Sequence, residues 1–146
     1  MNHWTFRRTL ILAAALFVAL AAGSANAANL PITGSYEVVT KTNAGSQAKV
    51  VLRFHLTNHS QAPLYLEAIV LRDLAQPASA SPGHLAVMLS SGNTEQVTQE
   101  FVIPRREFDQ WRRGTLPRFV LNLKTVHGTH IRQAIRMDHM PARRGE

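Results

Sequence analysis

Cysteine is absent from the sequence, and acidic residues are scarce. Without cysteine the protein has no disulfides, no thiolate metal sites, no cysteine nucleophile and no lipid attached at a lipobox cysteine. Nine Asp and Glu residues stand against sixteen Lys and Arg, which gives a formal net charge of +7. A chain of this size buries enough surface to be stable by packing alone, so the missing disulfides do not prevent folding.

The motifs of common enzyme classes are also absent. The sequence has no G-x-S-x-G, no H-E-x-x-H and no glycine-rich phosphate loop. Glu107 and Asp109 form a close pair of acids, but carboxylates at i and i+2 of a helix point apart. The sequence therefore predicts a protein that is not an enzyme and that has no cofactor.

Residues 1–27 have the pattern of a secretory signal peptide. Arg7 and Arg8 precede an apolar run over 10–22, which is shorter than the ~20 residues needed to span a bilayer. Ala25 and Ala27 supply the small residues of a cleavage site, so we expect cleavage after Ala27 and no transmembrane segment afterwards. The arginine pair also fits a twin-arginine signal, but the strongly apolar run favours the general pathway. Both routes predict a periplasmic or secreted protein.

The remainder of the chain reads as short strands separated by turns. Residues 48–58 alternate apolar and polar side chains, which is typical of a half-buried strand. Similar patterns occupy 34–42, 63–73, 84–92, 94–104, 118–128 and 129–137. About seven strands without a long helical period predict an all-β fold, an antiparallel immunoglobulin-like β-sandwich, with a small closed barrel as the alternative. We expect a single sandwich domain over 28–140 and a basic C-terminal tail over 141–146.

The segment LRFHLTNHSQAPLYLEAIVL at 52–71 contains a strand ending in T-N-x-S, then P-L and a second strand of branched apolar residues. It resembles a hairpin of fibronectin-type and related exported bacterial sandwiches, and EFVIP at 100–104 is similar in character. The chain lacks the paired cysteines and the core tryptophan of antibody-type domains. The resemblance implies the fold of an exported bacterial immunoglobulin/fibronectin-like domain and no functional residues.

RREFDQWRRG at 105–114 predicts one short helix near 105–113. Phe108 and Trp111 are three residues apart, so one helical turn places both on the same side. Gly114 suits the position that follows the end of a helix. We expect the two rings to cover one open end of the sandwich while the arginines remain in solvent.

The last two strands predict a hairpin with one buried face. The expected inward residues are Phe119, Leu121, Leu123, Ile131, Ile135 and Met137. A three-residue loop over 127–129, with Gly128 at positive φ, would pair Leu121 with Ile135 and Phe119 with Met137.

This register also predicts which charged residues lie together on the outer face of the hairpin. Lys124 would lie opposite Arg132, with Arg136 and His130 in the same stripe. Directly opposed like charges destabilise a sheet slightly, and nearby acids or an external anion would relieve them. The stripe is therefore a candidate contact surface.

Positive charge is concentrated in the C-terminal third. Residues 28–100 carry four Lys and Arg against five acids, whereas 101–146 carry ten against four. Such asymmetry often indicates nucleic acid, but export makes an acidic protein or an anionic envelope component the expected partner. A basic surface that only keeps the protein soluble is the alternative. The candidate partner-binding residues are Lys124, Arg132, Arg136, Arg112 and Arg113.

A metal site is a second hypothesis. His127 and His130 flank a turn, and His139 and Met140 lie in RMDHM near the C-terminus. Exported copper proteins combine such ligands because the soft thioether suits Cu(I). The sequence thus favours an exported non-catalytic binding or assembly module, with a periplasmic copper-binding or carrier protein as the alternative and a structural subunit of a larger exported complex as the third possibility.

Overall fold

The computed structural model describes residues 30–72 and 85–141, which form eight strands and one helix. The elements are β1 Ile32–Ala44, β2 Gln47–Asn58, β3 Leu64–Arg72, β4 Val87–Leu89, β5 Thr94–Pro104, α1 Arg105–Arg112, β6 Arg118–Thr125, β7 His130–Arg136 and β8 Asp138–His139. The predicted signal peptide lies outside the described residues, as does the predicted tail apart from Pro141. Within the described ranges, no helix is both long and apolar enough to cross a membrane.

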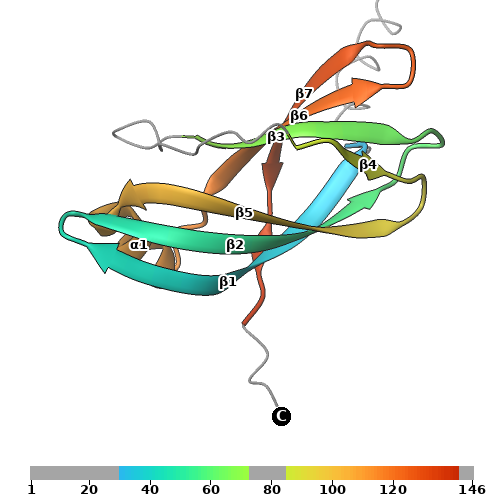
Figure 1. The fold of residues 1–146 in the computed structure, drawn as a ribbon. Helices are drawn as coiled ribbons and strands as arrows, with labels where there is room; N and C mark the ends of the chain where they lie inside the picture. Colours follow the sequence, from blue (N-terminus) through green and yellow to red (C-terminus); the bar gives the residue numbers. More distant parts are fainter. Residues whose placement is uncertain (1–29, 73–84, 142–146) are drawn as a thin grey trace, which may run out of the picture.

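The strands form two four-stranded sheets that pack face to face (Figure 1). Sheet A has the order β5-β2-β1-β8, and sheet B has the order β4-β3-β6-β7. All pairings are antiparallel except that of β8, which runs parallel to β1 at Ser35 and Tyr36. The all-β sandwich expected from the strand pattern is confirmed at this level, with β8 as an unpredicted additional strand.

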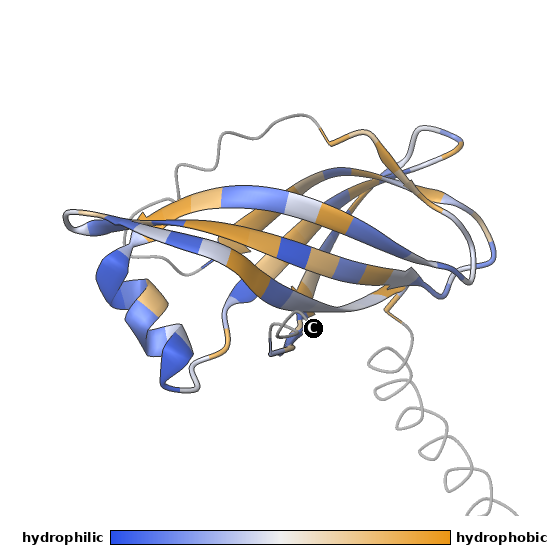
Figure 2. Cartoon of the chain, turned by 60° about the horizontal axis from the view of Figure 1, so that its bottom comes forward, coloured by the Kyte–Doolittle hydropathy of each residue, from blue (hydrophilic) through white to orange (hydrophobic). Residues whose placement is uncertain are grey.

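Strict alternation of side chains builds the core. Hydrophobic and hydrophilic residues alternate along the strands in Figure 2. In β2 every second residue from Ala48 to Leu56 is fully buried. Phe54 of β2 contacts Phe101 of β5 and Phe119 of β6 edge-on, with ring centroids 6.2 and 5.2 Å apart. Because Phe119 belongs to sheet B, this aromatic cluster joins the two sheets at the centre of the core.

Two buried glutamines tie the sheets together at opposite sides of the sandwich. Gln133 of β7 donates from Nε2 to the carbonyl of Ile32 at 2.7 Å and accepts from its N–H at 3.2 Å. Gln99 of β5 donates to the carbonyl of Ile69 in β3 at 3.3 Å. In the described part of the chain, Gln99 Oε1 is the one buried side-chain nitrogen or oxygen atom without a hydrogen-bond partner. Neither bridge follows from the strand pattern.

The predicted short helix is confirmed as α1, which covers one end of sheet A, where it contacts β2 and β5 (Figure 1). Phe108 is buried. Trp111 is partly buried and packs against the core, and the centroids of the Phe108 and Trp111 rings are 5.7 Å apart. Lys41 of β1 holds its ammonium 4.5 Å above the Phe108 ring and 3.9 Å from Asp109 Oδ1. Gly114 follows the helix with a φ of 102°, which confirms its predicted place after the helix end.

The predicted register of the last hairpin is wrong by two residues. Phe119 pairs with Ile135 and not with Met137, and Leu121 pairs with Gln133 and not with Ile135. The loop has the predicted length but occupies 126–128, because the N–H of Gly128 closes a turn onto the carbonyl of Thr125 at 3.0 Å.

The position of the glycine explains the difference. A three-residue hairpin loop combines a type I turn with a final residue at positive φ. Gly128 has a φ of 86°, and the predicted loop would have placed the β-branched Thr129 at that final position. A shift of two residues preserves which side chains face inward, so the buried positions of Phe119, Leu121, Leu123, Ile135 and Met137 are still confirmed.

Candidate functional site

The outward residues of sheet B form rows across its strands, because paired residues lie side by side about 4.8 Å apart. One row contains three arginines from three strands: Arg72 of β3, Arg118 of β6 and Arg136 of β7. A second row contains Ala68, Asn122 and Arg132. A third contains Met88, Tyr65, Lys124 and His130. We call the five cations Arg72, Arg118, Lys124, Arg132 and Arg136 the basic face.

Little negative charge from the described residues compensates the basic face. Like charges that lie directly opposite each other destabilise a sheet, and Arg118 lies between two other arginines. Arg118 already interacts with another group of the chain. The other four cations form no ion pair with any residue of 30–72 or 85–141. Glu67 lies on a bulge of β3, and its Oε2 is 3.1 Å from Nδ1 of His130. Within the described ranges the face therefore offers four cations without an ion-pair partner, Arg72, Lys124, Arg132 and Arg136.

A hollow of about 620 Å³ lies at the Lys124 end of this face. Its walls come from β3, the segment before β4 and the β6–β7 hairpin, and they include Tyr65, Leu85, Lys124 and Val126. Tyr65 is 39% exposed and Val126 49% exposed, so apolar surface is open to a partner here. The outer face of sheet B thus combines a hollow with apolar and polar walls at one end with cations along its length.

The structure brings together only some of the predicted partner-binding residues. Lys124, Arg132 and Arg136 share the basic face, but Lys124 lies opposite His130 and not opposite Arg132. Arg132 lies opposite Asn122. The exposed Arg112 and Arg113 lie at the end of α1, which packs on sheet A, so they do not belong to this face.

Arg72 and Arg118 were missed by the sequence analysis. Arg72 lies in the part of the chain that carries no excess positive charge, and it joins the face because β3 pairs with β6. The pairing is long-range, so charge counts along the chain give no sign of it. The feature that could have indicated both residues is their position at strand ends: Arg72 is the last residue of β3, and Arg118 is the first residue of β6.

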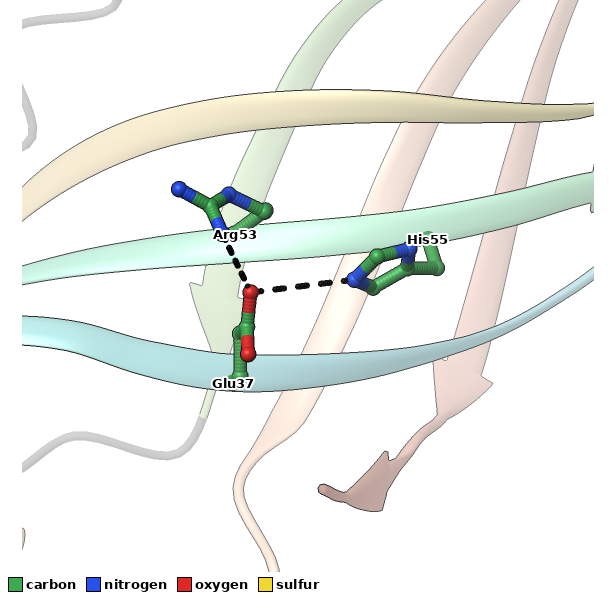
Figure 3. A network of polar contacts seen from close by, with 3 residues as sticks. All are labelled: Glu37, Arg53 and His55. Atoms are coloured by element: carbon green, nitrogen blue, oxygen red, sulfur yellow. Dashed lines mark hydrogen bonds and ion pairs between the residues drawn. The ribbon is translucent and has the colours of Figure 1, made fainter. Parts of the chain in front are cut away.

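A second polar cluster lies on the outer face of sheet A (Figure 3). Arg53 Nη1 donates to Glu37 Oε1 at 2.7 Å, and His55 Nε2 lies 3.9 Å from the same oxygen. The three side chains line a hollow of about 440 Å³ together with Gln96 and Met140. Because Glu37 and Arg53 neutralise each other, this cluster has much less attraction for an anion than the basic face has.

The candidate metal ligands lie in two separate places. His127 lines the hollow on sheet B, and His130 is bonded to Glu67. The His139 ring lies 5.2 Å from that of Tyr36 in sheet A, and Met140 lines the sheet A hollow. No group of three His, Cys, Asp or Glu side chains in the described part of the chain is placed to hold a metal ion. Met137 is buried in the core, as the sequence indicated.

The buried phenol of Tyr36 is the clearest case of a perturbed acid–base group. Burial raises the pKa of Tyr36 from 10.0 to about 12. Its ring lies against that of Phe119, and the residue is 3% exposed, so Tyr36 packs in the core and lines neither of the two hollows described above. The shift is a consequence of packing and gives no indication of acid–base catalysis.

The chain matches no protein-family model, and no curated protein matches it in sequence. Among solved structures it is similar to one described as the X-ray structure of Northeast Structural Genomics Consortium target SoR45, with 12% sequence identity. The match covers 79% of this chain and 90% of that chain, with a TM-score of 0.37. Values this low say nothing about family or function.

Proposed function

We propose that the protein is an exported, non-catalytic binding or assembly module that contacts an acidic partner through the basic face. The observation that carries the proposal is the set of four cations, Arg72, Lys124, Arg132 and Arg136, that have no ion-pair partner among the described residues. An acidic protein or an anionic envelope component would supply the missing charge. The secretory pattern of residues 1–27 supports a place outside the cytoplasm.

The strand order supports an immunoglobulin-like topology for this module. Sheet A contains the order β1-β2-β5, and sheet B contains β4-β3-β6-β7. These orders correspond to A-B-E and C′-C-F-G of immunoglobulin-type sandwiches, in which strands A, B and E share one sheet and C, F and G the other. Many domains with this architecture are binding modules on cell surfaces, which agrees with the proposed role.

Charge reversal tests the proposed function. The triple variant Lys124→Glu, Arg132→Glu and Arg136→Glu reverses three of the five cations of the basic face. Its binding to immobilised polyglutamate, and its capture of partners from an envelope extract, should fall at least about tenfold, because like charges across an interface cost several kcal/mol.

A matched control separates location from total charge. The variant Arg106→Glu, Arg112→Glu and Arg113→Glu has the same net charge, but the reversed residues are exposed on or beside α1. This control should retain most of the binding. An equal loss in both triple variants would show that only net charge matters, and unchanged binding of the first variant would remove the basic face as the contact surface.

A further inference from the structure

We infer that the occupant of the basic face is an extended acidic segment of a partner protein, which places one apolar side chain in the hollow beside Tyr65. The inference rests on the proposed function and adds the chemistry and spacing of the partner. It predicts that an apolar residue and two acidic residues of the segment point towards sheet B at fixed intervals.

The apolar end of the segment is indicated by where exposed apolar side chains gather. The described chain has six exposed large hydrophobic residues. Two of them, Tyr65 and Val126, line this hollow, and a third, Met88, belongs to the neighbouring strand β4. Tyr65 and Met88 are paired neighbours on the outer face of sheet B. An apolar side chain seated here would cover surface that is otherwise in water.

The acidic positions follow from the register of β6 and β7. Lys124 marks the end of the face beside the hollow, and Arg132 lies opposite Asn122, two residues from Lys124 along β6. Arg136 lies opposite Arg118, six residues from Lys124, which is about 20 Å along an extended strand. A segment with an apolar anchor at the hollow would therefore meet Arg132 two residues later and Arg136 six residues later.

These offsets are all even, so the three side chains lie on one side of an extended segment. The motif has an apolar residue at its first position and Asp or Glu two and six residues later, with any residue at the positions between them. Arginine recognises a carboxylate through two parallel hydrogen bonds, which makes it the suitable cation for fixed acidic positions. Between the Arg132 and Arg136 rows lie Val70, Val120 and Ala134 in register, of which Ala134 is exposed, Val70 is partly buried and Val120 is buried.

The shape of the face favours a protein segment over a membrane surface. The apolar residues surround a concave hollow at one end of the face, and a lipid surface would have to bridge the hollow without filling it. The cations extend along a twisted sheet, which a flexible extended chain follows more easily than a planar bilayer does. Both observations fit a chain that inserts one side chain and lies along the strands.

Labelled peptides test the inference by fluorescence anisotropy with the full chain. The patterned peptide contains Phe-Ser-Glu-Ser-Thr-Ser-Glu. A control of the same composition, Phe-Glu-Ser-Ser-Thr-Glu-Ser, places the acids at odd offsets, and a second control replaces Phe by Ser. The patterned peptide should bind at least about tenfold more tightly than either control, since each good charge-assisted contact or buried aromatic ring is worth about a factor of ten or more.

Two protein variants assign the contacts to residues. The double variant Arg132→Glu and Arg136→Glu should lose the preference for the patterned peptide over the control with displaced acids. The double variant Tyr65→Ser and Val126→Ser should bind the Phe and Ser peptides equally while still distinguishing the position of the acids. Circular dichroism and urea unfolding of both variants show whether the sandwich is intact, and both sets of substitutions are at residues with solvent-accessible side chains.

Other outcomes separate this inference from the proposed function. If polyglutamate binding depends on the basic face but both acidic peptides bind equally, the spacing is refuted and the proposed function stands. If vesicles of equal parts phosphatidylglycerol and phosphatidylcholine bind through the basic face and no peptide does, the partner is a lipid surface and the inference is overturned. If neither polyglutamate, peptides nor vesicles respond to charge reversal of the face, both are wrong.

Discussion

Replacement of Gln133 by leucine should lower the free energy of unfolding by more than the change in side-chain volume alone predicts. Gln133 and Ile32 are 4% and 0% exposed, so the two hydrogen bonds between them are shielded from water. Leucine has nearly the same volume but cannot pair with the N–H or the carbonyl of Ile32. Each buried backbone group left unpaired costs about 1–3 kcal/mol, and the gain from burying an apolar side chain offsets part of this cost. We expect a net loss of about 2–4 kcal/mol.

Urea unfolding of the wild-type chain and the variant at neutral pH measures the loss as a change in midpoint with an unchanged m-value. Gln96→Leu serves as the control, because Gln96 is exposed on the outer face of β5 and should change stability by less than about 0.5 kcal/mol. If Gln133→Leu is as stable as this control, the start of β1 is held by packing alone, and the bridge between the sheets contributes nothing.

Three further substitutions probe other parts of the sandwich. Trp111→Ala should lower the free energy of unfolding by about 3 kcal/mol, the lower end of the range for large aromatic residues because the ring is only partly buried; a loss below about 1 kcal/mol would show that the ring is not needed to close the end of the fold. Gly34→Ala should cost more than about 1 kcal/mol, since the added Cβ would lie 2.8 Å from the backbone oxygen of His55, and a stable variant would contradict that close packing. Tyr36→Phe should reduce the fall in the free energy of unfolding as the pH rises above 10. The raised pKa of Tyr36 gives a contribution that is fully present below pH 10 and declines as the pH rises towards about 12, so equal slopes of unfolding free energy for wild type and variant over that window would refute the shift.

Local patterns in the sequence were sufficient to predict every described element except the two-residue strand β8. The alternation in β2, the pair of aromatic residues in α1 and the inward residues of β6 each depend on neighbours within a few positions, and the structure confirms them. The hairpin register was missed by two residues because two placements of an equally long loop leave the same side chains buried. Only the requirement for positive φ at the last loop position, met by Gly128, distinguishes the two.

The candidate site was harder to predict because it depends on contacts between distant segments. Lys124, Arg132 and Arg136 were found from one hairpin, where sequence separation is small. Arg72 is far from them in sequence and reaches the same face through the β3–β6 ladder. Arg112 and Arg113 are closer to the hairpin in sequence but lie at the end of α1, which packs on sheet A. Charge composition thus predicted that a basic surface exists, and topology determined which arginines belong to it.

The central position of β6 in sheet B has a consequence for the order in which the protein can fold. Until β6 is available, the described part of sheet B consists of β3 and the three-residue strand β4. A two-stranded ladder of that length is not stable by itself. The inner face of sheet A would meanwhile lack its main cover, since Phe119 and its neighbours come from β6. The described elements before β6 therefore form only an incomplete sandwich. We expect proteolysis from the C-terminus to unfold the domain once β6 is removed.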